Sequence, residues 1–339
     1  MTSSSPIDRN FPLIDLHHHL DGSVRLETIL DLGLKHNLPL PATTLEGLRP
    51  FVQVSTPQPG VMAFIEKFQW MTGVLVDYDA CRRIAFENLE DAAKEGIDYI
   101  ELRYSPWFMA EAHGLDPAGV VEAVTEGVRA GERQFGIKAN QIGILSRHYG
   151  PEIAAKELDA LRHYRDEITA LDLAGDEGNF AGSLFVEHFR MAHDLGWHIT
   201  VHAGEIRGPE SVWQALRELK AERIGHAVHA IEDPLLMDYL AEHQIGVESN
   251  LTSNVQTTTV ANYAEHPLKI FLEKGIPATI NTDDPGISAI NLTYEYEIAA
   301  PAAGLSLEQI RQAQQNALAT AFITQAQKEE LLHKAASRE

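Results

Sequence analysis

The feature that most constrains the fold is an alternation of short apolar segments with longer amphipathic segments, which continues along most of the chain. Apolar and β-branched residues are concentrated in eight segments that are each predicted to form a strand: residues 11–17, 97–104, 138–145, 168–174, 197–202, 223–226, 245–249 and 276–281. Because helical patterns separate these segments, consecutive strands should pair in parallel. Eight such units close into a barrel, so the sequence predicts an α/β protein with a (β/α)8 TIM-barrel fold.

We expect a single domain over residues 1–339, with two departures from the simple barrel. Residues 37–96 contain five prolines before position 60, followed by helical patterns, and are predicted to form a helical insertion after the first strand. Because long insertions are usually functional, residues 61–76 are predicted to form a lid over the barrel mouth. The apolar stripe around Phe64 fits ordinary core packing equally well, so that alternative stays open. Residues 290–339 show no strand pattern and are predicted to be C-terminal helices.

Composition and charge argue against several classes of function. The 339 residues are 44% hydrophobic and carry a net charge of −22, which disfavours nucleic-acid polymers and anionic membranes as partners. Cys81 is the single cysteine, which excludes an internal disulfide framework and favours a reducing compartment. The sequence shows neither a signal-peptide pattern nor an apolar run of membrane-spanning length. A cytoplasmic protein is therefore expected.

Polar side chains gather at the predicted ends of the strands, and in a barrel of this type the carboxyl ends of the strands carry the reactive residues. Reading only those ends gives His17, His19, Arg103, Asp172, Gly175, His202, Glu205, His226, His229, Ser249, Asp283 and Asp284. His17 and His19 are two residues apart on a strand, so they should point to the same side while His18 points away. Together with His202 and Asp283 they form a candidate metal site of three nitrogens and one oxygen.

Each part of this constellation has a simpler explanation when it is taken alone. A His-X-His sequence is often structural, and an Asp-Asp pair before a proline is often a turn signal. His148 is a less favoured candidate for the mouth of the barrel, and His198 is predicted to be a packed core histidine. The joint occurrence at several independent strand ends is what favours a metal site.

The type of metal chemistry follows from the ligands and from what the strand ends lack. The fourth strand end, at residues 171–175, carries no lysine to bridge two ions, so one metal is favoured. Histidine and carboxylate ligands with one open position suit Zn²⁺, which lowers the pKa of a bound water to about 7. Glu205, just beyond the turn after His202, can move a proton beside that metal without binding it. The sequence contains no Gly-X-Ser-X-Gly motif for a serine nucleophile.

These motifs together resemble the adenosine deaminases in their bacterial form, within the metal-dependent amidohydrolases. The resemblance is carried by His17-His-His19-Leu-Asp21-Gly, Asp172-Leu-Ala-Gly175-Asp-Glu, His202-Ala-Gly-Glu205, Arg223-Ile-Gly-His226 and Asn281-Thr-Asp283-Asp284-Pro. It runs from about Leu13 to Pro285, and the order and spacing of the motifs are highly specific. It implies one Zn²⁺ ion per chain, held by His17, His19, His202 and Asp283.

The resemblance also implies hydrolytic deamination of adenosine and 2′-deoxyadenosine to inosine and ammonia, as part of purine salvage. Glu205 would protonate purine N1, and His226 would orient and deprotonate the attacking water. Asp284 would lie beside that water and reach N7, while the backbone N–H of Gly175 would bind N3. Asp21 would bind a ribose hydroxyl, and the ligand His19 would also border the substrate.

Two positions depart from the family pattern, and several rival activities stay open. Ala227 follows His226 where the family usually has glycine, and His18 adds a third imidazole beside the ligands. Adenine deaminases typically carry glutamate at position 21, so Asp21 favours a nucleoside. Deamination of another aminopurine, such as aminodeoxyfutalosine, would use the same ring contacts. A non-catalytic nucleoside-binding relative should have lost part of the constellation, which is intact.

Overall fold

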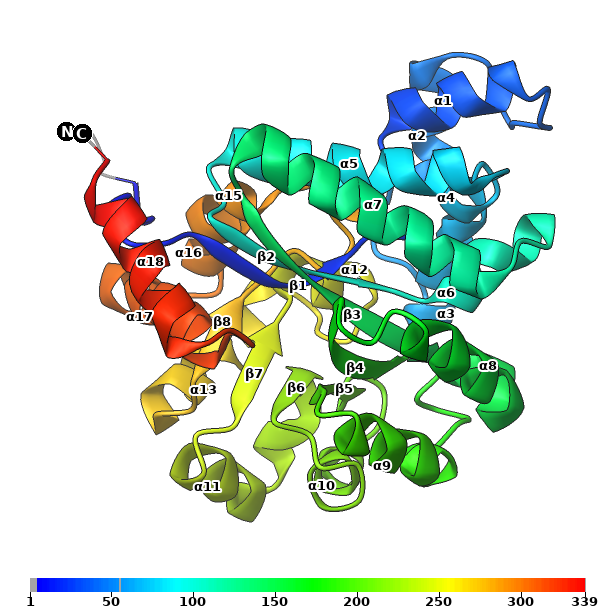
Figure 1. The fold of residues 1–339 in the computed structure, drawn as a ribbon. Helices are drawn as coiled ribbons and strands as arrows, with labels where there is room; N and C mark the ends of the chain where they lie inside the picture. Colours follow the sequence, from blue (N-terminus) through cyan, green and yellow to red (C-terminus); the bar gives the residue numbers. More distant parts are fainter. Residues whose placement is uncertain (1–4, 55, 339) are drawn as a thin grey trace.

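The structure is a computed structural model that describes residues 5–54 and 56–338. Eight parallel strands form one sheet in the order of the sequence, surrounded by helices (Figure 1). The strands are β1 (Ile14–His19), β2 (Tyr99–Tyr104), β3 (Lys138–Ser146), β4 (Ile168–Ala174), β5 (His198–Ala203), β6 (Arg223–His226), β7 (Gly246–Ser249) and β8 (Ala278–Ile280). The predicted (β/α)8 barrel is confirmed.

The helices between the strands follow from local sequence signals. The longest, α7, has Pro117 in its first turn, Asp116 as its N-cap and Gly136 in the left-handed region, with φ 68°, just after its end. The outer helices after β2 are α7 (Pro117–Phe135), α8 (Gly150–Arg162), α9 (Val186–Asp194), α10 (Pro209–Arg217), α11 (Pro234–Glu242) and α13 (Leu268–Lys274), with the shorter α6 (Pro106–Ala110) and α12 (Leu251–Gln256) at strand ends. Within the described ranges, no helix is long and apolar enough to cross a membrane.

Additional helices lie between β1 and β2 and after β8. The first group comprises α1 (Leu26–Lys35), α2 (Leu45–Val52), α3 (Val61–Ile65), α4 (Gln69–Thr72) and α5 (Tyr78–Glu95). The second comprises α14 (Pro285–Ser288), α15 (Leu292–Tyr294), α16 (Ala300–Ala302), α17 (Leu307–Thr320) and α18 (Gln325–Ala336). Short 3₁₀ turns occupy Glu66–Phe68, Glu111–His113, Arg147–Tyr149, Gly182–Phe185, Val228–Glu232 and Tyr263–Glu265, and Glu295–Ala299 is a π-helical turn. Helix α17 packs against β1 and β8 (Figure 1).

The barrel closes between β1 and the segment that follows β8. The backbone N–H of Asp283 donates to the carbonyl of His17 at 2.8 Å, and the N–H of His19 donates to the carbonyl of Asp283 at 2.7 Å. These bonds flank a parallel bridge between His18 and Asp283. Closure therefore brings two predicted metal-binding histidines and the predicted aspartate ligand together through their own backbone.

A layer of charged side chains lies inside the barrel beneath its carboxyl end. Arg103 on β2 is fully buried, and its guanidinium lies 2.8 Å from Asp172 and 2.9 Å from Glu248. Arg223 on β6 pairs with Glu248 at 2.7 Å and also with Glu101. Buried charges of this kind are tolerated only when they are paired and hydrogen-bonded, as these are.

Candidate active site

The four side chains predicted as metal ligands converge at the carboxyl ends of β1, β5 and β8. His17 Nε2 lies 3.1 Å from Asp283 Oδ1, and His19 Nε2 lies 3.3 Å from the same oxygen. His19 Nε2 is also 3.3 Å from His202 Nε2. Ligands held about 2.0–2.2 Å from a tetrahedral zinc ion lie about 3.3 Å from one another, so this spacing suits the metal. The buried His17 Nε2 has no hydrogen-bond partner among the described residues, as a nitrogen reserved for a metal should.

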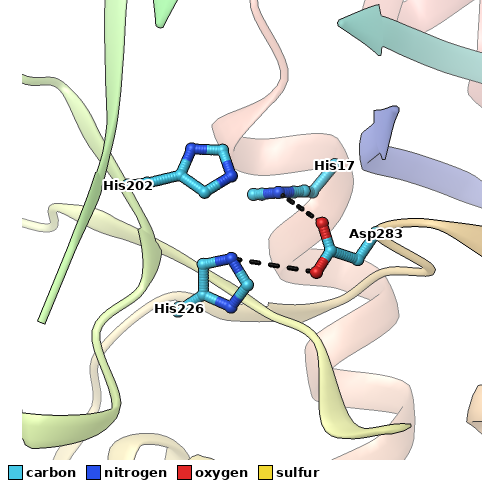
Figure 2. Close-up of side chains that lie close together, drawn as sticks. All are labelled: His17, His202, His226 and Asp283. Carbon is cyan, nitrogen blue, oxygen red and sulfur yellow. Dashed lines mark ion pairs between the residues drawn. The ribbon is translucent and has the colours of Figure 1, made fainter. Parts of the chain in front are cut away.

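His226 lies in the same cluster, as Figure 2 shows. Two groups of side chains each place one possible ligand atom per residue within 4.8 Å of one another. The first is His17, His202, His226 and Asp283, and the second is His19, Asp283 and Asp284. His226 Nε2 is 3.9 Å from Asp283 Oδ2, the oxygen other than the one that faces His17 and His19. His226 thus lies farther from Asp283 than His19 does, whereas its ring centroid is 5.1 Å from those of His17 and His202, compared with 5.3 Å for the ring of His19.

Buried carboxylates contact two of the predicted ligands on the side away from the cavity. His17 Nδ1 is 2.7 Å from Glu248, and His202 Nδ1 is 3.0 Å from Asp172. Arg103 contacts both carboxylates. A carboxylate on the far nitrogen of a metal-binding histidine fixes its tautomer, so that the nitrogen facing the site is free to bind. Arg103 and Asp172 are among the strand-end residues predicted from the sequence, whereas Glu248, which lies within β7, is not.

His202 and Glu248 have different protonation states because their surroundings differ. Burial lowers the pKa of His202 to about 3 despite the opposing effect of Asp172, so the imidazole is neutral. Burial raises the pKa of Glu248, but the charges of Arg103 and Arg223 outweigh it and hold that pKa well below its usual value. The histidine is therefore in the form that binds a metal, and the carboxylate behind the site is ionised.

Glu205, in contrast to the ionised Glu248, is a carboxyl group that keeps its proton. Its side chain is buried beside the ligand cluster, 3.7 Å from His226 Nδ1. Burial, followed by the negative charges of Asp283 and Glu177, raises the pKa of Glu205 to about 8. A carboxyl group that keeps its proton at neutral pH can serve as a general acid.

The loop that carries Glu205 is anchored by a residue to which the sequence analysis gave no role. Glu177 is buried and accepts hydrogen bonds from the backbone N–H groups of Gly204 at 2.7 Å, Glu205 at 3.2 Å, Ile206 at 2.7 Å and Arg207 at 3.0 Å, and from the Ser211 hydroxyl. One carboxylate thus satisfies five donors and fixes the turn after β5. The signal that points to Glu177 is its place two residues after Gly175, at the end of β4.

Asp283 and Asp284 have different surroundings although they are adjacent. Burial opposes ionisation of Asp283, but His17 and His226 hold its pKa well below the usual value. Burial and the charge of Asp283 raise the pKa of Asp284 well above its usual value. Asp284 Oδ1 has no hydrogen-bond partner among the described residues and packs against Gly22, where an added Cβ would lie 1.8 Å from it. The first aspartate suits a cation and the second suits a polar ligand.

A cavity of about 640 Å³, including its open mouth, lies over this cluster. Eight of the predicted site residues line it: His19, Asp21, Gly175, His202, Glu205, His226, Asp283 and Asp284. Gly175 has φ +99°, and an added Cβ would lie 2.7 Å from His148 Nδ1, so both the conformation and the space require glycine. Asp21 accepts the N–H of Ser105 with one oxygen, while its other oxygen is buried without a partner among the described residues.

The remaining predictions at single positions have mixed outcomes. His18 points away from the ligands, toward Asn88 at 2.9 Å, as predicted. His148 lines the cavity. The prediction for His198 is wrong, because this first residue of β5 is exposed and lies 2.9 Å from Glu222. Ala227 has φ 53°, which explains why a glycine would suit the position.

The fold and the cluster define the class, a (β/α)8 barrel whose strand ends present histidine and aspartate ligands to a cavity. The model of the family described as adenosine deaminase matches residues 12–337. A protein of Escherichia coli O1:K1 named adenosine deaminase is 59% identical over 332 residues, which cover 98% of this chain and 100% of that protein. The chain therefore belongs to the adenosine deaminase family.

Solved structures agree in fold. An adenine deaminase of Arthrobacter aurescens superposes with a TM-score of 0.89 at 24% identity, over 96% of this chain and 98% of that one. At that identity the likeness shows the fold alone. The N6-mAMP deaminase of Arabidopsis superposes with a TM-score of 0.83 at 26% identity, over 97% of this chain and 99% of that one.

The Glu177 anchor generates a prediction. Glu177→Gln replaces one acceptor oxygen by an NH2 group that faces backbone donors, so the Glu205 loop should lose its fixed position. We expect kcat to fall about 10- to 100-fold while bound metal is unchanged, because misplaced catalytic groups cost rate. Glu187→Gln on the exposed face of α9 is the matched control. A Glu177→Gln protein with the control's kcat would contradict the anchoring role.

Proposed function

We propose that this chain catalyses the hydrolytic deamination of adenosine, and of 2′-deoxyadenosine, to inosine and ammonia in purine metabolism. The observation that carries the proposal is the full-length likeness to proteins named adenosine deaminase, at 59% identity. It is supported by the cavity, which brings a protonated Glu205, an unpartnered Asp21 oxygen and the histidine–aspartate cluster together. We place the enzyme in the cytoplasm, in keeping with its single cysteine.

Zinc is the metal we propose, with one ion per chain. His17, His19, His202 and Asp283 would hold it, since their spacing suits a tetrahedral ion and His202 is neutral. When bound, such an ion lowers the pKa of a water molecule to about 7 and so supplies the nucleophile. Among divalent ions the affinity order favours Zn²⁺ over Fe²⁺.

The protein's own groups would bind and orient the nucleoside. The free oxygen of Asp21 offers an acceptor to a ribose hydroxyl, which a free purine base lacks. Gly175 lets the purine approach the backbone, so its N–H can donate to N3. Asp284 borders the cavity with a raised pKa, and in its protonated form it can donate to N7.

Glu205 and His226 would carry the proton transfer and the orientation of the water. As water adds to C6, electron density moves onto N1, and the Glu205 carboxyl group can donate its proton there. His226 lies 3.7 Å from Glu205 and 3.9 Å from Asp283, so it borders the point where the water attacks. One proton of the water would pass to N6, so that the C6–N6 bond breaks and ammonia leaves. The other would return to Glu205 as the C6=O bond of inosine forms, while N1 keeps the proton that Glu205 gave.

We also propose that residues 1–339 form one deaminase domain in which 37–96 is a helical lid insertion and 290–339 are C-terminal helices. Val61, Phe64, Ile65 and Phe68 line the cavity from α3 and the turn after it. Their side chains would cover the purine and exclude water from the reaction.

The proposed function is tested by ammonia release from purified protein given adenosine and adenine in parallel, before and after chelation of metal. We expect metal-dependent turnover of adenosine and slow turnover of adenine. Preference for adenine would keep the metal chemistry and overturn the assignment of Asp21. No turnover of either substrate by metal-loaded protein would contradict the proposal and favour another aminopurine.

The acid role of Glu205 is tested by substitution and by pH. Glu205→Gln cannot donate an acidic proton, so kcat should fall about 10²- to 10⁴-fold while zinc stays bound. In the unsubstituted enzyme the active form is the protonated one, so kcat/KM should fall as pH rises through the pKa of Glu205, about 8. A bound cation favours the carboxylate form of Glu205, so the fall in kcat/KM should be centred at a pH no higher than this pKa. Glu210→Gln, at an exposed position nearby, is the control, and an active Glu205→Gln enzyme would refute the assignment.

The lid is tested at Phe64, which is buried against the cavity. If the segment covers the purine, Phe64→Ala should raise KM for adenosine more than it lowers the stability of the fold. KM is measured by steady-state kinetics and stability by thermal unfolding. Met62→Ala, exposed on the same helix, should change neither. A large loss of stability with unchanged KM would assign Phe64 to the core instead.

A further inference from the structure

Two buried residues behind His226 connect it to the backbone of α13. Asn254 lies on α12, and His266 lies two residues before α13 begins. Both side chains are buried, with exposed fractions of 0% and 3%. Neither belongs to the residues that line the cavity, so neither is placed to touch substrate.

A series of hydrogen bonds runs from the backbone N–H of Leu268 through His266 and Asn254 to His226. Its direction is fixed because it starts at a backbone amide, which can only donate. The N–H of Leu268 can only donate, and it donates to His266 Nδ1 at 3.1 Å. His266 Nδ1 therefore carries no hydrogen, and the proton of the neutral ring must be on Nε2. His266 Nε2 lies 3.1 Å from Asn254 Oδ1, so this N–H donates to the amide oxygen.

The direction continues through the amide to His226. Once Asn254 Oδ1 is the acceptor for His266, the Asn254 NH2 group must face the other way. It lies 2.9 Å from His226 Nδ1 and donates to that nitrogen. His226 Nδ1 is therefore an acceptor, and the proton of the neutral His226 ring is on Nε2, the nitrogen 3.9 Å from Asp283.

The surroundings keep both rings neutral. Burial, with a smaller effect of His226, lowers the pKa of His266 to about 3. The His226 ring carries no second proton, because its Nδ1 accepts the hydrogen bond from Asn254. The amide nitrogen of Asn250 is 3.4 Å from both nitrogens of His226, so it lies against the ring and selects neither tautomer. The direction is thus set by Asn254.

We propose that His266 and Asn254 are positioning residues that hold His226 in the tautomer with its proton on Nε2, so that His226 presents a hydrogen-bond donor to the reacting centre. The proposal deepens the proposed deaminase function and rests on it for its catalytic consequence. In this tautomer Nε2 can donate but cannot accept. His226 would then orient the attacking water as a donor, which narrows the role that the family resemblance implies, in which His226 also removes the proton.

The substitution that should reverse the tautomer is Asn254→Asp. A carboxylate can accept from His266 Nε2 and from His226, but it cannot donate, so the His226 proton should move to Nδ1. His266→Leu adds no charge but removes the N–H that fixes the orientation of the Asn254 amide. The amide can then turn either way, so both tautomers of His226 should be populated. His266→Gln places an amide N–H where Nε2 was and should restore the native state. Asn262→Asp adds the same charge at an exposed site in the same segment and is the control.

The tautomer is read directly by nitrogen-15 NMR of zinc-loaded protein labelled at histidine, without nucleoside, because protonated and unprotonated ring nitrogens resonate far apart. The His226 signals are assigned by their loss in His226→Asn. We expect the proton on Nε2 in the native protein, His266→Gln and Asn262→Asp, on Nδ1 in Asn254→Asp, and a mixture in His266→Leu. A native His226 protonated on Nδ1, or a tautomer unchanged in both folded Asn254→Asp and His266→Leu, would overturn the proposal.

Kinetics with adenosine then test the catalytic consequence. Asn254→Asp should lower kcat about 10²- to 10⁴-fold with KM within about threefold, since the donor is lost and the cavity wall is not. His266→Gln should recover most of kcat. A reversed tautomer with the native kcat would overturn the catalytic part of the proposal. If the native protein shows the expected tautomer but does not turn over adenosine, the proposed function fails and the tautomer assignment stands.

Discussion

The closure of the barrel between β1 and the segment after β8 is the constraint on which the site depends. The two backbone hydrogen bonds between His17, His19 and Asp283 complete the barrel and at the same time fix three of the four proposed ligands. The fourth, His202, enters from β5 on the opposite part of the barrel wall and meets them at 3.3 Å. The fold and the site are thus held by the same contacts.

The ionised layer beneath the site gives chemically similar groups different tasks. Arg103 holds Asp172 and Glu248 as carboxylates, and each of them orients one histidine. Among the described residues, Glu205 forms no ion pair with an arginine or lysine, and it keeps its proton because it is buried near other negative charges. Environments that push the pKa values of carboxyl groups apart are how acid and base roles are assigned within one cavity.

The sequence predicted the barrel and the proximity of these strand-end residues because both follow from local patterns. Strand–helix alternation determines parallel pairing, and parallel strands place all their carboxyl ends on one face, so His17, His202 and Asp283 had to converge. The resemblance then gave them roles. The His198 prediction failed because apolar neighbours on a strand do not reveal that its first residue emerges at the far rim, where this side chain is exposed.

The residues that sequence reasoning missed act through other residues. Glu177 was visible beside Gly175, but its five donors come from a turn 27 to 34 positions later in the chain, a distance that no local pattern encodes. Glu248 lies within a strand rather than at its end. His266 and Asn254 matter through the direction of their hydrogen bonds, which depends on one backbone amide in the folded protein.

The measurement that tests the central claim most directly is crystallographic anomalous scattering at the zinc edge from metal-loaded protein. The convergence of strand ends predicts one peak per chain, bounded by the Nε2 atoms of His17, His19 and His202 and by Asp283. Glu205 and His226 should lie beside the ion without binding it. Two peaks in the cavity, or an ion bound by His226 in place of His19, would contradict this account of the site.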